Sequence, residues 1–215
     1  MTSVGLAAAA LVSAMTVAMP TAAAVPSGFT DTLVRGGFSS PTALEILPGG
    51  RIAVLEKGGT VEIVHPDGSE VRALTVPVCT SSEMGLLGMA LDPDFATNGF
   101  VYLYRTRPGA GGACTADVRG ERLSRFTMTG DTINPASEVV LLDNIAGTET
   151  ESFGNHNGGD LEIPSDGYLY VSVGDSGSDP RNNSGSSGAN DAGQDRSLLN
   201  GKILRITTLG APATL

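Results

Sequence analysis

The sequence contains two histidines, and only one of them has surroundings that suit chemistry. His156 lies in Phe153-Gly-Asn-His-Asn-Gly-Gly159, directly before a predicted strand, and glycines on both sides let the backbone approach a ligand closely. Asp175 follows the partner strand of the same predicted hairpin, so the two side chains should meet at one end of the sheet. An Asp bonded to imidazole orients the ring and raises its basicity, as a general base requires.

A structural role is the alternative for this pair, since a His and an Asp can simply pin two loops together. Spacing alone favours neither interpretation. His65 precedes Pro-Asp-Gly, which is a turn signal, and it is expected to be an exposed turn residue without a role.

Other catalytic and binding signatures are weak. The sequence has no G-x-S-x-G elbow, no P-loop and no G-x-G-x-x-G fingerprint. Asp92 and Asp94 flank Pro93, which indicates a turn. Four carboxylates lie in or near one Gly- and Ser-rich stretch, namely Asp175, Asp179, Asp191 and Asp195. They could bind Ca²⁺, but their spacing does not fit an EF-hand, and solvated loop acids are the expectation.

Cys79 and Cys114 are the two cysteines of the chain. In an oxidising compartment such a pair indicates a disulfide, which would close a loop of about 35 residues and contribute about 2–4 kcal/mol. Two buried thiols are the alternative. Neither C-x-x-C nor a Cys/His cluster of the zinc type is present.

The elements that would position these residues form a repeated pattern. An apolar strand, a turn with Pro, Asp or Gly, and an alternating strand recur at residues 42–55, 88–104 and 159–173. Each such hairpin continues to a further alternating strand, at residues 60–64, 122–128 and 201–206. The sequence therefore predicts a unit of three or four antiparallel strands that occurs three times.

A repeated small sheet of this size is typical of a β-propeller blade, and a sandwich with similar hairpins is the alternative. Closed propellers have about 4–8 blades. We therefore expect an all-β chain with about three blades that forms roughly the N-terminal half of a larger protein, or else two arcs that assemble into a ring. Residues 174–195 are predicted to form a long loop.

Composition and charge limit the function classes. The chain of 215 residues has 29 Gly and 12 Pro, which suits short strands and tight turns. Its net charge of −10, without a basic stripe, argues against a nucleic-acid surface.

The N-terminus predicts export. An apolar run, Val4 to Met19, precedes Ala22-Ala23-Ala24, so residues 1–24 are expected to be a signal peptide and residues 25–215 a partial propeller. A disordered Ala-rich leader is the alternative. The run is too short for a comfortable membrane span, so a secreted or periplasmic protein without a membrane span in its mature chain is expected.

Three motifs carry a family resemblance. Residues 83–95 resemble the G-L-L-G-x-A-x-x-P-x-F motif of the soluble quinoprotein sugar dehydrogenases, the glucose/sorbosone dehydrogenase family. Residues 155–161, with 166–170 and 174–177, resemble the His-containing motif of that family. Residues 194–206 resemble the strand that follows it.

This resemblance implies a six-bladed propeller, pyrroloquinoline quinone (PQQ), Ca²⁺ and the oxidation of the anomeric hydroxyl of an aldose to a lactone. It implies that His156 takes the hydroxyl proton while hydride passes to PQQ, and that Asp175 holds the imidazole. Glu83 falls where the family commonly places Gln near the cofactor, so Glu83 and His156 are the expected cofactor contacts. The cations and carbonyls that hold PQQ and Ca²⁺ in the family come from later blades.

Two other function classes stay open at this point. The first is a propeller of the same family that serves as an extracellular binding module without redox activity. The second is a propeller hydrolase that uses a loop carboxylate and a metal. The expected partner is a small sugar, and the sequence does not specify which sugar or which electron acceptor.

Overall fold

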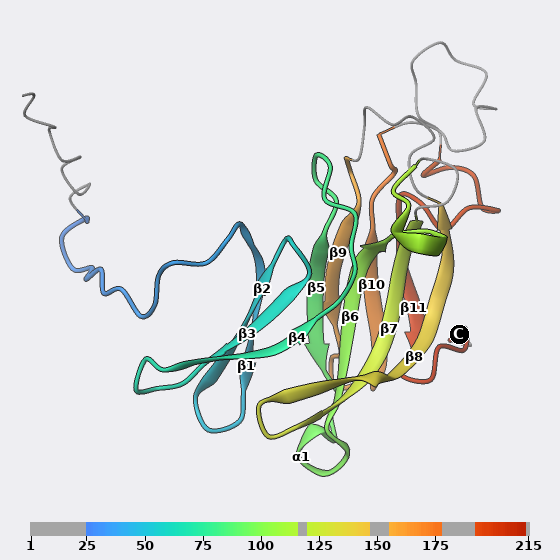
Figure 1. The fold of residues 1–215 in the computed structure, drawn as a ribbon. Helices are drawn as coiled ribbons and strands as arrows, with labels where there is room; N and C mark the ends of the chain where they lie inside the picture. Colours follow the sequence, from blue (N-terminus) through green and yellow to red (C-terminus); the bar gives the residue numbers. More distant parts are fainter. Residues whose placement is uncertain (1–24, 116–119, 147–154, 178–191, 214–215) are drawn as a thin grey trace, which may run out of the picture. The chain divides into compact units, whose positions relative to one another are not determined.

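The computed structural model describes residues 25–115, 120–146, 155–177 and 192–213 (Figure 1). The predicted leader, Asp179 and Asp191 lie outside the described residues. The chain divides into two units, Met1–Val34 and Arg35–Leu215. The described part of the first unit, residues 25–34, is exposed and contains no helix or strand.

The described residues of the second unit form three antiparallel sheets, each made of strands that neighbour one another in chain order. The first sheet contains β1 (Pro41–Leu47), β2 (Arg51–Glu56), β3 (Thr60–Val64) and β4 (Glu70–Thr75). The second contains β5 (Leu86–Leu91), β6 (Phe100–Arg107), β7 (Gly120–Thr129) and β8 (Thr132–Ala146). The third contains β9 (Gly158–Glu162), β10 (Tyr168–Val173) and β11 (Lys202–Thr207).

Two short helical segments complete the described elements, α1 (Phe95–Asn98) and a 3₁₀ turn at Ala110–Gly112. The predicted repeat of small antiparallel sheets is therefore confirmed. The first strands of successive sheets contact one another, β1 with β5 and β5 with β9. Sheets that meet through their first strands have the arrangement of β-propeller blades, so the fold is a partial all-β propeller, with three blades among the described residues (Figure 1).

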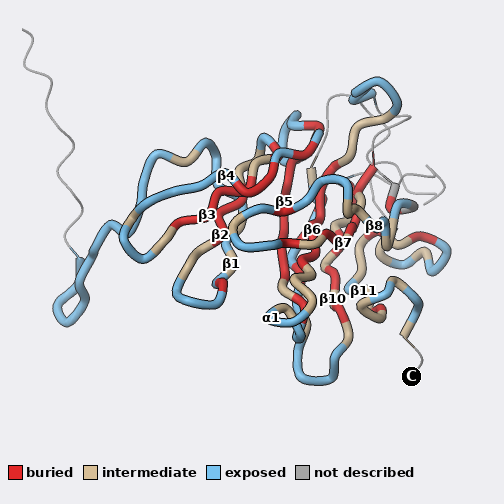
Figure 2. The backbone as a smooth tube through the Cα atoms, turned by 60° about the horizontal axis from the view of Figure 1, so that its bottom comes forward, coloured by how far each residue is buried: buried red, intermediate tan, exposed pale blue. Residues whose placement is uncertain are grey.

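Two hydrophobic cores hold the three sheets together. Strand β6 contributes to both, because successive side chains of a strand point to opposite faces. Val101 and Leu103 pack into the core between the first and second sheets, and Tyr102 and Tyr104 pack into the core between the second and third. The central position of the second sheet explains why β6 is buried along most of its length (Figure 2).

The innermost strands β5 and β9 approach each other at two glycines. A Cβ at Gly88 would lie 1.7 Å from the carbonyl oxygen of Gly159. A Cβ at Gly159 would lie 2.8 Å from Cβ of Leu87. Neither position has room for a side chain, so these glycines set the distance between the second and third sheets.

A disulfide joins Cys79 to Cys114, with 5.6 Å between the two Cα atoms, as the sequence predicted. Cys79 belongs to the segment that leads into β5 and is buried, while Cys114 lies in the connection from β6 to β7 and is exposed. The bond therefore fastens the entry to the innermost strand of the second sheet.

Two residues expected to be simple turn formers have further contacts. Asp92 is buried and accepts hydrogen bonds from the Tyr102 hydroxyl at 2.6 Å and from the side-chain amide of Asn98 at 2.8 Å. His65 is only partly exposed, and its Nε2 lies 3.2 Å from Asp131, in the turn between β7 and β8. The expectation of an exposed His65 was therefore wrong, because tertiary packing brings a second-sheet carboxylate to it.

Within the described ranges, no helix has the length and apolar character needed to cross a membrane.

The close approach of β5 and β9 predicts a position-specific effect of adding one methyl group. Gly88→Ala should lower the free energy of unfolding by at least about 3 kcal/mol, because backbone must move to admit the Cβ. Gly58→Ala is the matched control, since its Cβ would meet nothing within 4 Å, and it should change stability by less than about 0.5 kcal/mol. Equal urea-unfolding midpoints for the two variants would contradict this account of the sheet spacing.

Loss of the disulfide should also destabilise the protein. Cys79→Ser is expected to lower the free energy of unfolding by about 2–4 kcal/mol, since the unfolded chain gains loop entropy. Thermal unfolding with and without dithiothreitol measures the effect. Reductant should shift the wild type toward the variant and leave the variant unchanged.

Candidate functional site

His156 occupies a strained turn directly before β9. Its φ angle is 55°, in the left-handed region that residues other than glycine seldom adopt. That conformation costs about 1–2 kcal/mol for an L-residue, so it persists only where contacts enforce it. Such strain outside glycine is enriched at functional sites, which makes the contacts of this residue informative.

Three contacts hold His156. Its ring Nδ1 lies 2.7 Å from Oδ1 of Asp175. Its backbone N–H donates to Oε2 of Glu83 at 2.7 Å, and its carbonyl accepts the N–H of Ser176 at 3.2 Å. Within the described ranges, ring Nε2 has no hydrogen-bond partner, and the side chain is 56% exposed. The ring is thus fixed on one side and open on the other.

Asp175 reaches the imidazole because the two ends of the β9–β10 hairpin pack backbone to backbone. The N–H of Gly174 donates to the carbonyl of Asn157 at 3.3 Å. A Cβ at Gly174 would lie 1.6 Å from the carbonyl oxygen of His156, so only glycine fits there. The expectation that His156 and Asp175 meet at one end of the third sheet is confirmed.

The electrostatics of this pair favour an ionised carboxylate. Partial burial raises the pKa of Asp175, but the N–H of Gly177, 3.0 Å from Oδ1, and the His156 ring outweigh it, so the pKa lies below its ordinary value. An ionised carboxylate can only accept, so Nδ1 of His156 carries the proton and donates it to Asp175. In a neutral imidazole with this tautomer, the lone pair lies on Nε2, the exposed nitrogen.

Two side chains that the sequence did not point to, Tyr104 and Asn200, hydrogen-bond to the residues next to His156 and Asp175. The Tyr104 hydroxyl, from β6, donates to the carbonyl of Asn157 at 3.0 Å. Asn200 is buried, and its side-chain amide donates to the hydroxyl of Ser176 at 2.6 Å. In the sequence, Tyr104 has the pattern of any apolar residue in an alternating strand. Nothing in that pattern predicts its hydrogen bond to the Asn157 carbonyl.

Glu83 comes from the second sheet, in the segment that enters β5. The structure therefore brings together the three predicted site residues Glu83, His156 and Asp175. Their roles as base, orienting group and cofactor contact remain predictions.

A hollow of about 560 Å³ lies alongside the innermost strands β1, β5 and β9. Three of its lining residues are acidic, Glu45, Asp160 and Glu162. Burial, followed by repulsion from Glu162, raises the pKa of Glu45. In the part of the chain that the structure describes, no cluster of three His, Cys, Asp or Glu side chains could hold a metal ion.

The chain is similar in sequence and in fold to known proteins. The sequence profile of the family described as Glucose / Sorbosone dehydrogenase matches residues 38–214. The structure of the PQQ-bound form of aldose sugar dehydrogenase from Streptomyces coelicolor superimposes with a TM-score of 0.66 at 31% identity, over 84% of this chain and 48% of that one.

Two curated relatives are similar in sequence. The uncharacterized protein slr1608 of Synechocystis is 31% identical over 188 residues, which is 82% of this chain and 42% of the relative. Aldose sugar dehydrogenase YliI of Escherichia coli is 26% identical over 190 residues, which is 87% of this chain and 46% of the relative. The chain thus spans somewhat less than half the length of the relatives that it matches.

The lowered pKa of Asp175 predicts a pH-dependent loss in Asp175→Asn. The folded carboxylate binds its proton less readily than the unfolded one, so its stabilisation is present above the ordinary pKa of 3.8 and is lost as pH falls through the folded value. At pH 7 the variant should lose about 0.5–1.5 kcal/mol after solvent screening.

Urea unfolding at pH 7 and at pH 3 measures this difference, which should shrink at the lower pH. Asp160→Asn is the control, because this exposed carboxylate accepts no hydrogen bond from the described residues. A deficit in Asp175→Asn that is equally large at both pH values would remove the carboxylate charge as its cause.

Proposed function

The chain belongs to the glucose/sorbosone dehydrogenase family, and on that premise we propose that it supplies the proton-accepting side of a PQQ-dependent aldose dehydrogenase. In this proposal His156 takes the proton from the anomeric hydroxyl of an aldose, which becomes a lactone. One observation carries it: among the described residues, Glu83, Asp175 and Ser176 hold the other polar groups of His156, and ring Nε2 has no hydrogen-bond partner.

The proposed proton transfer depends on a difference between the two ring nitrogens of His156. Because Nδ1–H is committed to Asp175, Nε2 carries the lone pair and accepts the substrate proton. The imidazolium that forms is stabilised by the carboxylate at 2.7 Å. A positioned base of this kind contributes about 10²- to 10⁴-fold to a rate. Asp175 is thus the orienting partner of the base.

The described residues fit one side of PQQ. An open imidazole nitrogen with a carboxylate beside it suits the reacting side, and we propose that Glu83 and His156 lie next to the cofactor. When bound, PQQ supplies the hydride acceptor. Two lysines of the described residues donate to backbone carbonyls, Lys57 to Ser82 and Lys202 to Ala192 and Asn200.

The described residues contain no group of three or more His, Cys, Asp or Glu side chains that could hold Ca²⁺. No step is therefore assigned to Ca²⁺. Asp195, one of the loop acids considered as a ligand, accepts hydrogen bonds from the backbone and hydroxyl of Ser197. The whole enzyme activity is proposed for the full-length protein, since the chain spans less than half of its relatives.

Export is part of the proposal. A disulfide persists in oxidising compartments, and the predicted leader at residues 1–24 would direct the chain there.

The decisive experiment compares His156→Ala with the wild type. Full-length protein is supplied with PQQ and Ca²⁺, and reduction of an artificial dye is followed with a panel of aldoses. Wild-type protein should turn over at least one aldose, and His156→Ala should lose about 10²- to 10⁴-fold in kcat with unchanged folding. His65→Ala is the control histidine, and its rate should match that of the wild type.

Other outcomes contradict the proposal in different ways. Bound PQQ without turnover of any sugar would indicate a binding module. Hydrolysis of an ester or lactone without PQQ would indicate a hydrolase. A wild-type rate in His156→Ala would remove this residue from the mechanism.

A further inference from the structure

We propose that Glu83 is a positioning residue that holds the His156 backbone in its left-handed conformation and thereby aims the imidazole. The catalytic consequence rests on the proposed function, but the hydrogen bond that carries it can be tested without turnover. In this role Glu83 acts on His156 across the boundary between the second and third sheets.

The geometry singles out the backbone of His156. Oε2 of Glu83 lies 2.7 Å from the His156 nitrogen, a distance typical of a hydrogen bond to a charged acceptor. His156 lies before the first residue of β9, outside the ladder of its own sheet, and its N–H donates instead to Glu83 in the segment that enters β5. If Glu83 is removed, the turn can relax toward negative φ, and the ring that follows the backbone moves with it.

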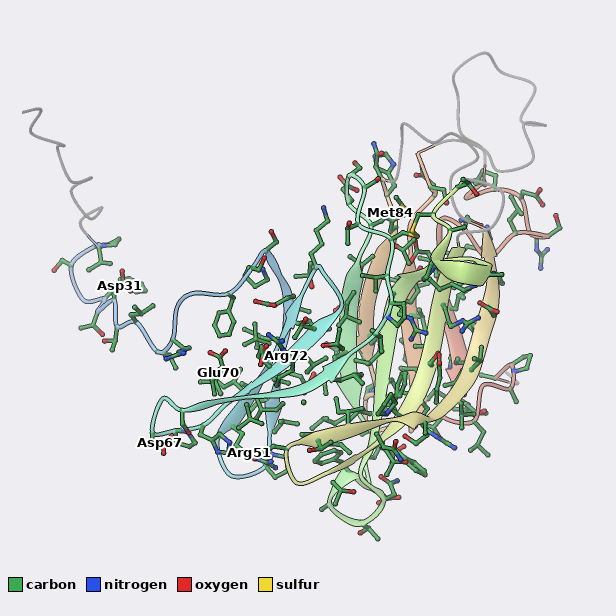
Figure 3. All side chains as sticks on the ribbon, viewed as in Figure 1. Asp31, Arg51, Asp67, Glu70, Arg72 and Met84 are labelled. Atoms are coloured by element: carbon green, nitrogen blue, oxygen red, sulfur yellow. A yellow bond between two sulfur atoms is a disulfide. The ribbon has the colours of Figure 1, made fainter. Side chains whose placement is uncertain are left out.

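The segment that bears Glu83 is anchored by its neighbours. Met84 is 1% exposed and buries its side chain where the segment enters β5, near the upper end of the second sheet in Figure 3. The Lys57 ammonium, from the turn after β2, donates to the carbonyl of Ser82. The disulfide of Cys79 fixes the start of the same segment.

Thr106 in β6 fastens the segment a second time. Its carbonyl accepts the N–H of Cys79 at 3.0 Å, and its N–H donates to the carbonyl of Gly85 at 2.8 Å. Its buried hydroxyl lies 3.3 Å from the Gly85 nitrogen and donates to Glu121 at 2.8 Å. The disulfide, the lysine hydrogen bond and the backbone hydrogen bonds therefore hold residues 79–85 in place.

Glu83 itself contributes little to this anchoring. It is exposed, and its carboxylate hydrogen-bonds to the His156 N–H and to no other described residue. A rigid segment that presents one carboxylate to one strained backbone N–H suits positioning. If Glu83 served to stabilise residues 79–85 instead, its carboxylate would hydrogen-bond within that segment.

The test uses side chains of similar size that differ in whether they can accept a hydrogen bond. Glu83→Gln retains a carbonyl oxygen at the same reach, and Glu83→Leu has no acceptor. Full-length protein is labelled with ¹⁵N-histidine, and the His156 amide is assigned by its loss in His156→Ala. The amide proton should move clearly upfield and exchange faster in Glu83→Leu, and Glu83→Gln should restore most of both properties.

Kinetics with PQQ and the preferred aldose provide the second readout. Glu83→Leu should lower kcat about 10- to 100-fold with little change in KM, because a misaimed base slows chemistry more than binding. Glu83→Gln should recover to within about 3-fold of the wild type. Glu70→Leu, which removes a first-sheet carboxylate bonded to Arg35, is the control and should retain the wild-type kcat.

Two results would overturn the inference. The first is a His156 amide that is unchanged in Glu83→Leu. The second is a defect in Glu83→Leu confined to KM or to PQQ affinity, with kcat at saturation intact, which would make Glu83 a ligand contact only. If the wild type turns over no sugar, the proposed function fails, and the amide spectra still decide whether Glu83 holds the turn.

Discussion

The contact between the innermost strands β5 and β9 determines where the site forms. Gly88 and Gly159 bring these strands so close that no Cβ fits between them. Glu83 precedes β5 and His156 precedes β9, so the register of this contact places the two entering segments side by side. The hydrogen bond between the strained turn at His156 and its acceptor Glu83 depends on that spacing.

Much of the fold could be predicted because its signals are local. Each sheet is contiguous in the sequence. The hairpins at residues 42–55, 88–104 and 159–173 could be recognised because apolar and polar residues alternate on either side of a turn. The meeting of His156 and Asp175 could be predicted for the same reason, since both flank one hairpin. The alternation of residue types and the residues of the turn are sufficient to predict contacts within one hairpin.

Contacts between sheets could not be predicted in this way. The hydrogen bond from His156 to Glu83 spans 73 positions, and no pattern in either segment points to the other. The resemblance to a family placed Glu83 near a cofactor without indicating what its carboxylate does here. His65 illustrates the same limit, because its local turn predicted exposure and Asp131 of another sheet covers it.

The disulfide bears on how the protein can be produced. Cys79 lies only four positions before Glu83, so the covalent bond to Cys114 restrains the segment that reaches the His156 turn. A host cytoplasm rich in reduced glutathione keeps such thiols apart. Recombinant material made there would have the right sequence and a loosened segment, whereas expression in a periplasm or an endoplasmic reticulum would supply the oxidising machinery that completes it.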